Sequence, residues 1–304
     1  MKSLTLAFIA LLALTQAPPS IRPDPPHKCF DCDAWNRPVE PFRVFGNTYF
    51  VGVADLSAVL ITSGGGSILL DGGLPQSAPL IDASIRKLGF KTEDIKLIVN
   101  SHAHYDHAGG IAALQRASGA AVAASAAGKR AIERGEPTPD DPQFAFGRAA
   151  NGFPAVTNVR AVADGETLRV GELTVTAHLT PGHTPGATTW TWRSCDGPTC
   201  RDIVYADSLN AVSDDEFRFT GGGGRPSIVD VFRKSIATVA ALPCDIIISV
   251  HPSATNMAAK VKQRGASQAA DPFVAPDGCR AYAAGAGTRL DARIAQEQKA
   301  RAPR

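Results

Sequence analysis

Short apolar segments separated by turn residues occupy the first part of the chain. They predict strands at residues 42–45, 49–53, 58–62 and 67–70, interrupted by Gly46-Asn47 and by the three glycines at 64–66. From residue 78 onward, helical spacing of apolar residues alternates with further short apolar runs. The segments predicted there are helices at 78–88, 111–118, 126–134, 227–242 and 279–298, and strands at 95–99, 121–124, 159–162, 167–170, 173–179, 188–192, 202–206 and 245–250.

This alternation of strands and helices predicts the α/β class. No linker divides it, so we expect a single domain over residues 41–298, preceded by a proline-rich extended arm at 18–40 and followed by a polar tail at 299–304. Residues 1–17 place an early positive charge before a short apolar run and end in small residues, which predicts a secretory signal peptide. A membrane anchor is the alternative, and Pro18 leaves the cleavage position open.

Composition and charge narrow the functional classes. The 304 residues are 44% hydrophobic and 20% charged, which is typical of a soluble globular protein, and a net charge of +2 gives no electrostatic reason to expect nucleic acid as a partner. No membrane contact is expected after signal cleavage, and nothing in the sequence indicates more than a monomer.

Six cysteines are an even number, and in an exported chain they invite pairing in the periplasm or outside the cell. Cys195 and Cys200 bracket a turn, so a disulfide there would close a hairpin. Cys244 precedes a predicted strand and Cys279 opens the last predicted helix, so these two could form a second bridge. The remaining pair, Cys29 and Cys32, either joins locally or forms a metal or redox pair.

Candidate chemistry is concentrated after the strand at 95–99, where the sequence reads His102-Ala103-His104-Tyr105-Asp106-His107. Residues two apart on an extended segment point the same way, so His102 and His104 can bind one cation while Asp106 and His107 reach a second. Imidazole and carboxylate ligands suit Zn²⁺. The alternative is a histidine cluster on a solvated turn.

Two further histidines occupy comparable places. His183 lies in the turn-rich Thr-Pro-Gly-His-Thr-Pro-Gly segment, and His251 follows the predicted strand at 245–250. With the motif residues they make two sets of three ligands, each with a position left for water, which is the catalytic rather than the structural pattern. Asp71, at the end of another strand, is either a turn carboxylate or an acceptor for a metal-bound histidine. The irregular segment 135–153 is either a functional loop or a surface excursion.

The histidine motif, the Thr-Pro-Gly-His-Thr-Pro-Gly loop at 180–186, Tyr-Ala-Asp-Ser-Leu at 205–209 and His251-Pro252 together resemble the metallo-β-lactamase superfamily, and in detail its B3 subclass. The resemblance covers residues 28–298. It implies an αββα sandwich, in which two facing mixed β-sheets carry helices on their outer faces. It also implies two Zn²⁺ per chain, the first bound by His102, His104 and His183 and the second by Asp106, His107 and His251.

The implied activity is hydrolysis of the β-lactam amide bond by a hydroxide that bridges the metals and is oriented by Asp106, with a broad spectrum that includes carbapenems, giving antibiotic resistance in the periplasm. Ser208 and Asn210 would contact the substrate, although asparagine departs from the serine or threonine common at position 210. The alternative is a thioesterase of the glyoxalase II type or a lactonase. Either activity is favoured if Asp207 rather than Ser208 reaches the metals. A nuclease and a non-enzymatic metal-binding or redox protein are weaker alternatives.

Overall fold

Two β-sheets form the centre of the molecule in this computed structural model, which describes residues 21–266 and 270–300. The first sheet has seven strands in sequential order, with antiparallel pairing from β1 to β4 and parallel pairing from β4 to β7. Its strands are β1 Phe42–Phe45, β2 Thr48–Phe50, β3 Val59–Ser63, β4 Gly66–Leu70, β5 Ile95–Val99, β6 Ala121–Ser125 and β7 Arg160–Val162.

The second sheet has five strands in the order β12-β11-β10-β9-β8. Only β11 and β12 run parallel in it, so this sheet is mixed as well. Its strands are β8 Thr167–Val170, β9 Leu173–Leu179, β10 Thr188–Asp196, β11 Thr199–Ala206 and β12 Ile246–Ser249.

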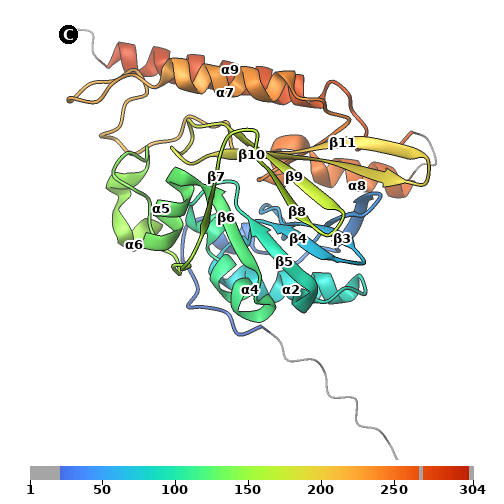
Figure 1. The fold of residues 1–304 in the computed structure, drawn as a ribbon. Helices are drawn as coiled ribbons and strands as arrows, with labels where there is room; N and C mark the ends of the chain where they lie inside the picture. The colour runs from blue at the N-terminus through green and yellow to red at the C-terminus, as the bar shows by residue number, and fades with distance from the viewer. Residues whose placement is uncertain (1–20, 267–269, 301–304) are drawn as a thin grey trace, which may run out of the picture.

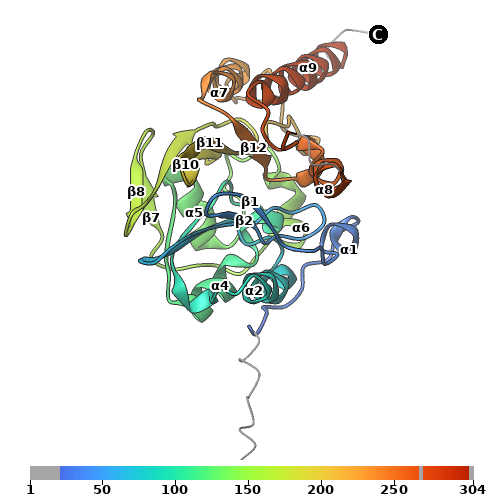
Figure 2. The ribbon, with the colours of Figure 1, turned by 90° about the vertical axis from the view of Figure 1, so that its right-hand side faces the viewer.

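Helices cover the outer face of each sheet (Figure 1). The helices α2, α4 and α5 lie along the seven-stranded sheet, and α7 and α9 lie side by side over the five-stranded sheet, as the turned view in Figure 2 also shows. The α-helices are α1 Cys32–Trp35, α2 Ala78–Lys87, α3 Tyr105–Ala108, α4 Ile111–Ser118, α5 Ala126–Arg134, α6 Gly147–Asn151, α7 Val229–Ala241, α8 Met257–Ala266 and α9 Gly278–Lys299, with short 3-10 helices at Pro75–Ser77, Thr92–Asp94, Phe144–Phe146 and Pro252–Thr255.

Three buried apolar clusters separate these layers. One joins inward-facing residues of the two sheets, including Trp190 and Phe50. A second lies between the seven-stranded sheet and its helices, and the third, which contains Phe232 and Leu290, lies between the five-stranded sheet and the α7–α9 pair. Alternate residues of a strand face opposite sides, so each sheet contributes to two of these clusters. The predicted αββα sandwich is confirmed.

The three disulfides join the pairs Cys29–Cys32, Cys195–Cys200 and Cys244–Cys279. The second closes the β10–β11 hairpin, which is longer than the two separate strands predicted from the sequence. The third ties the approach to β12 to the start of α9, as the sequence suggested. The first confirms local pairing of the CxxC cysteines, the question that the sequence had left open.

The structure also contains helices that the hydrophobic pattern did not reveal. The segment expected to be an extended arm includes the single turn α1, and α8 follows the last strand. Both are short or polar, so neither gives a strong apolar repeat. The signal peptide predicted at 1–17 and all but the first two residues of the tail predicted at 299–304 lie outside the described residues. Among the described helices, none has both the length and the apolar character needed to cross a bilayer.

Candidate metal centre

The candidate site lies where strands of both sheets end. In the first sheet, the parallel strands β4 and β5 end at Leu70 and Val99 and are followed by Asp71 and the histidine motif. In the second, the parallel strands β11 and β12 end just before Asp207 and His251. The carboxyl ends of parallel strands meet at one edge of a sheet, which is where ligands bind in open α/β folds. Segments that are distant in sequence therefore converge here.

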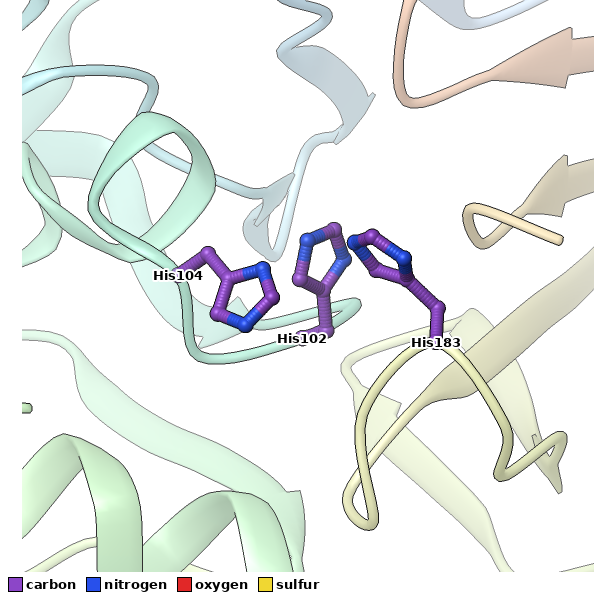
Figure 3. A group of neighbouring side chains, drawn as sticks. All are labelled: His102, His104 and His183. Carbon is purple, nitrogen blue, oxygen red and sulfur yellow. The ribbon is translucent and has the colours of Figure 1, made fainter. Parts of the chain in front are cut away.

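Three imidazoles form the first triad: His102, His104 and His183. Their ring centroids are 4.9, 4.8 and 5.0 Å apart, and the ring planes cross at 76–89°. One nitrogen from each ring can be chosen so that all three lie within 4.8 Å of one another. Figure 3 shows His183 approaching the two motif histidines from the opposite sheet. The three residues are buried, so this is an interior tripod of nitrogen donors.

The second triad is Asp106, His107 and His251. The Asp106 Oδ2 atom is 3.1 Å from His107 Nε2 and 3.5 Å from His251 Nε2, and the two Nε2 atoms are 3.3 Å apart. A tetrahedral zinc ion with bonds of about 2.0–2.1 Å places neighbouring ligand atoms roughly 3.3–3.4 Å apart. The second triad matches that spacing closely. His102 also lies within 4.8 Å of Asp106 and His107, so the two triads are adjacent.

In four of the five histidine rings, the nitrogen that faces away from the triads donates a hydrogen bond to an acceptor of the protein. The Nδ1 atom of His102 donates to Asp207 Oδ1 at 2.7 Å, and Nε2 of His104 donates to the Asp141 carboxylate at 3.2 Å. Backbone carbonyls serve the other two, because His183 Nδ1 donates to Asn210 O at 2.8 Å and His251 Nδ1 to Asp55 O at 2.9 Å. Each bond fixes the tautomer and turns the remaining nitrogen toward the triads.

Electrostatics within the site divide the histidines into rings that stay neutral and rings that hold a proton when no cation is bound. Burial, together with the charges of neighbouring histidines, lowers the pKa of His102 well below its ordinary value and that of His183 to about 3, so both rings are neutral. Burial opposes the charged form of Asp106, but His107 and His251 outweigh it and hold its pKa well below the usual range. Burial likewise lowers the pKa of His251, yet Asp106 and Asp55 raise it to about 10. Without a cation, the protons on imidazole supply the positive charge that these carboxylates require.

Asp71 braces the histidine motif through hydrogen bonds. Its carboxylate accepts bonds from Asn100 Nδ2, Ser101 N, Ser101 Oγ and Tyr205 OH at 2.6–2.9 Å. Its backbone adopts φ = 59°, which turns the chain sharply at the end of β4. The nearest ring nitrogen, His107 Nδ1, is 3.9 Å away, too far for a hydrogen bond. Of the two roles that the sequence allowed, the turn carboxylate is the one that the geometry supports.

Two of the site contacts come from aspartates that sequence reasoning missed, Asp141 through its carboxylate and Asp55 through its backbone carbonyl. Asp141 lies in the irregular segment 135–153 and is buried against His104. Asp55, in the turn between β2 and β3, contacts His251. The only sequence signal for Asp141 was the length of its segment, and there was none for Asp55. Segment 135–153 therefore reaches the site, which favours the functional interpretation of that loop over a surface excursion.

Ser208 and Asp207 have different surroundings. The Asp207 carboxylate is completely buried on the Nδ1 side of the His102 ring, away from the other triad histidines. Ser208 instead lines a cavity together with Asn210 and His251. The condition that would favour the thioesterase or lactonase alternative, a carboxylate at position 207 directed at the metals, is not what this geometry shows.

Comparisons with known proteins agree with this architecture. Residues 51–251 match the family model described as the metallo-beta-lactamase superfamily. A solved structure titled Rm3 metallo-beta-lactamase is 49% identical with a TM-score of 0.85 over 89% of this chain and 99% of its own. MEM-A1, a subclass B3 metallo-beta-lactamase from a soil metagenome library, is 50% identical with a TM-score of 0.83 over 88% of this chain and 100% of its own. SMB-1, solved in complex with mercaptoacetic acid, is 44% identical with a TM-score of 0.81 over 86% of this chain and 99% of its own.

Proposed function

The chain belongs to the metallo-beta-lactamase superfamily, and on that premise we propose that it hydrolyses the amide bond of β-lactam antibiotics with two zinc ions, in the manner of its subclass B3 relatives. The observation that carries the proposal is the pair of adjacent triads, His102, His104 and His183 beside Asp106, His107 and His251. Each triad offers three protein ligands and leaves a coordination position for water or substrate, which distinguishes a catalytic zinc site from a structural one.

We assign the two metals to the two triads. His102, His104 and His183 would hold the first, and Asp106, His107 and His251 the second. The donors are imidazole nitrogen and carboxylate oxygen without a thiolate, a set that suits zinc. When bound, such a metal pair supplies a hydroxide at neutral pH and withdraws charge from both the attacked carbonyl and the leaving nitrogen.

The side chains of the site have distinct tasks in this scheme. Asp106 remains ionised because His107 and His251 hold its pKa far below neutrality, so it can accept a hydrogen bond from the attacking water and orient it. Asp207 and Asp141 hold His102 and His104 in the tautomers that bind metal. Ser208 and Asn210 line the adjoining cavity, where the substrate would lie.

The proposal also covers the compartment, the oligomeric state and the substrate range of the enzyme. Three disulfides are typical of an oxidising compartment, which supports export to the periplasm. We expect a monomer that acts on a small-molecule substrate, and a broad spectrum that extends to carbapenems. A thioesterase or lactonase activity is the alternative that the experiment must separate.

A paired assay tests the proposal. The purified protein is analysed for metal content and assayed on a penicillin, a cephalosporin and a carbapenem, and in parallel on a thioester and a lactone. We expect about two zinc ions per chain, β-lactam hydrolysis that a chelator abolishes, and recovery of activity when zinc is restored. Efficient cleavage of the thioester or lactone without chelator-sensitive β-lactam hydrolysis would contradict the assignment.

A further inference from the structure

A cavity of about 330 Å³ adjoins the second triad and includes a residue that contacts the first. His251 of the second triad forms part of its wall, and so does Asn210, whose carbonyl accepts the hydrogen bond from His183 of the first triad. The lining residues are Trp35, Ser208, Leu209, Asn210, Ser249, His251, Ser253, Ala254, Tyr282 and Arg289. Its volume lies within the range of sites for small organic molecules. A molecule that reacts at the metal centre therefore has room to extend toward α9.

The charge of this cavity comes from α9. No acidic side chain is among its lining residues, and Arg289 is its only permanently charged group. Tyr282 and Arg289 are seven residues apart and so share one face of the helix. The Cys244–Cys279 disulfide attaches the start of α9 to the segment that leads into β12, so this face is held at the edge that carries His251.

Arg289 is also the arginine of α9 that lacks a carboxylate partner. In the same helix Arg280 pairs with Asp277, and Arg293 pairs with Glu297 at 2.8 Å. Within the described residues, the Arg289 guanidinium has no hydrogen bond or ion pair, and neither do the side chains of Ser208 and Asn210. The hydroxyls of Ser253 and Tyr282 in the same cavity already donate, to Asp55 and to the Asp207 carbonyl. Arg289, Ser208 and Asn210 thus offer unused donors to one cavity.

We propose that Arg289, together with Ser208 and Asn210, binds the carboxylate that β-lactam antibiotics carry beside the lactam nitrogen, which makes Arg289 a specificity-determining residue. The inference rests on the proposed function. A guanidinium matches a carboxylate in charge and in the fork geometry of its N–H groups, and charge-assisted hydrogen bonds of this kind are stronger than neutral ones. Because the contact lies away from the scissile bond, it contributes equally to binding of the substrate and of the transition state.

Kinetics on two matched substrates test this inference. Arg289→Gln should raise KM for a penicillin roughly tenfold and leave kcat unchanged, since uniform binding is lost and the site is exposed to solvent. The methyl ester of the same penicillin should show the same KM with the variant as with the wild type. Arg289→Lys keeps the charge and should restore most of the affinity for the acid.

Arg233→Gln is the matched control, because it removes the same charge from α7, where Arg233 pairs with Asp291 outside the cavity. Varying the ionic strength gives a test that needs no variant. Raising it from about 0.01 M to about 1 M should raise the wild-type KM for the acid but not for the ester. An unchanged KM in Arg289→Gln, an equal rise for acid and ester, or an equal effect of Arg233→Gln overturns the inference while the proposed function stands. If the wild type hydrolyses no β-lactam, the proposed function itself fails.

Discussion

The two triads stand side by side, yet the protein supports them differently. The first consists of imidazoles alone, and two of its rings depend on side-chain carboxylates from remote segments, Asp207 and Asp141. The second contains its own carboxylate, Asp106, and its His251 is held by a backbone carbonyl. The first triad therefore relies on side chains that a substitution can remove. The second relies chiefly on the backbone, which supplies the carbonyl that holds His251.

This difference shows where charge is balanced. A cation at the second triad meets the negative charge of Asp106 directly, whereas at the first it meets three imidazole rings, two of which reach buried carboxylates through their far nitrogens. Hydrogen bonds to those carboxylates make the imidazoles stronger donors. In the second triad the negative charge is on a ligand atom. In the first it lies behind the imidazole rings, on the carboxylates that accept their hydrogen bonds.

The largest effect on metal binding and activity should follow removal of one ligand from either triad. His183→Ala and His251→Ala should each lower the bound zinc from about two ions to about one. Loss of a supporting partner alone costs 10–100-fold in activity or affinity, so kcat/KM should fall by more than about 100-fold in both. Metal analysis and steady-state kinetics measure this. If either variant lost both metals equally, the division into two triads would be wrong.

A smaller effect on metal affinity should distinguish a histidine supported by a side chain from one supported by the backbone. Asp141→Asn keeps the shape but removes the charge behind His104, and we expect one metal to bind roughly 10-fold more weakly. Asp55→Asn is the matched control, because the carbonyl that accepts from His251 remains, and it should alter metal affinity little. Competition titrations with a chromophoric chelator report both values. Equal weakening by the two substitutions would remove the contrast drawn between the triads.

The smallest effect on the metals should come from a buried carboxylate whose hydrogen bonds go to residues outside both triads. Glu297 of α9 accepts hydrogen bonds from Phe219 N, Thr220 N, Thr220 Oγ and Arg293 at 2.7–3.0 Å. Glu297→Gln should lower the free energy of unfolding by about 2 kcal/mol and leave the zinc content unchanged. Denaturant unfolding with metal analysis checks this, and a change in zinc content would mean that α9 supports the triads.

The same variant has a pH dependence whose sign is fixed. Burial alone would raise the pKa of Glu297, but Arg293 and the Thr220 and Phe219 donors outweigh it and lower that pKa. A carboxyl group whose pKa is lowered by folding stabilises the fold above its unfolded pKa, about 4.3, and loses that contribution as the pH falls through the folded value. The stability difference between wild type and Glu297→Gln should therefore shrink at pH below about 4.3. A difference that grew on acidification would contradict the network.

The sequence was sufficient for most of the architecture. Apolar runs such as Leu97-Ile98-Val99 are buried on both sides in a layered fold, so their positions were readable, and the helical spacing before Gly89 marked α2. Helices with weak apolar repeats were not readable. The single turn α1 is held by a disulfide, and α8 buries only Met257 among its ten residues, so neither has a period that the pattern could show.

The site was predictable in its ligands and less so in their supports. Histidines at strand ends stand out because they are few, and all five converge at the triads. Asp141 and Asp55 could not be recognised, since an aspartate in a turn is ordinary and only the folded chain brings them to His104 and His251. Within residues 21–266 and 270–300 the Arg289 guanidinium has no partner, and this could not be recognised either, because it depends on how α9 packs.

His107 and His251, whose ring nitrogens are 3.3 Å apart, are separated by 144 residues of chain. An unfolded chain seldom brings such positions together, so a cation held between them is a ligand of the native state alone. Mass action then converts occupancy into stability, amounting to about 2.7 kcal/mol when the free metal is at 100 times its dissociation constant. In an environment poor in that metal, the protein would lose part of its resistance to unfolding at the same time as it lost its bound cation.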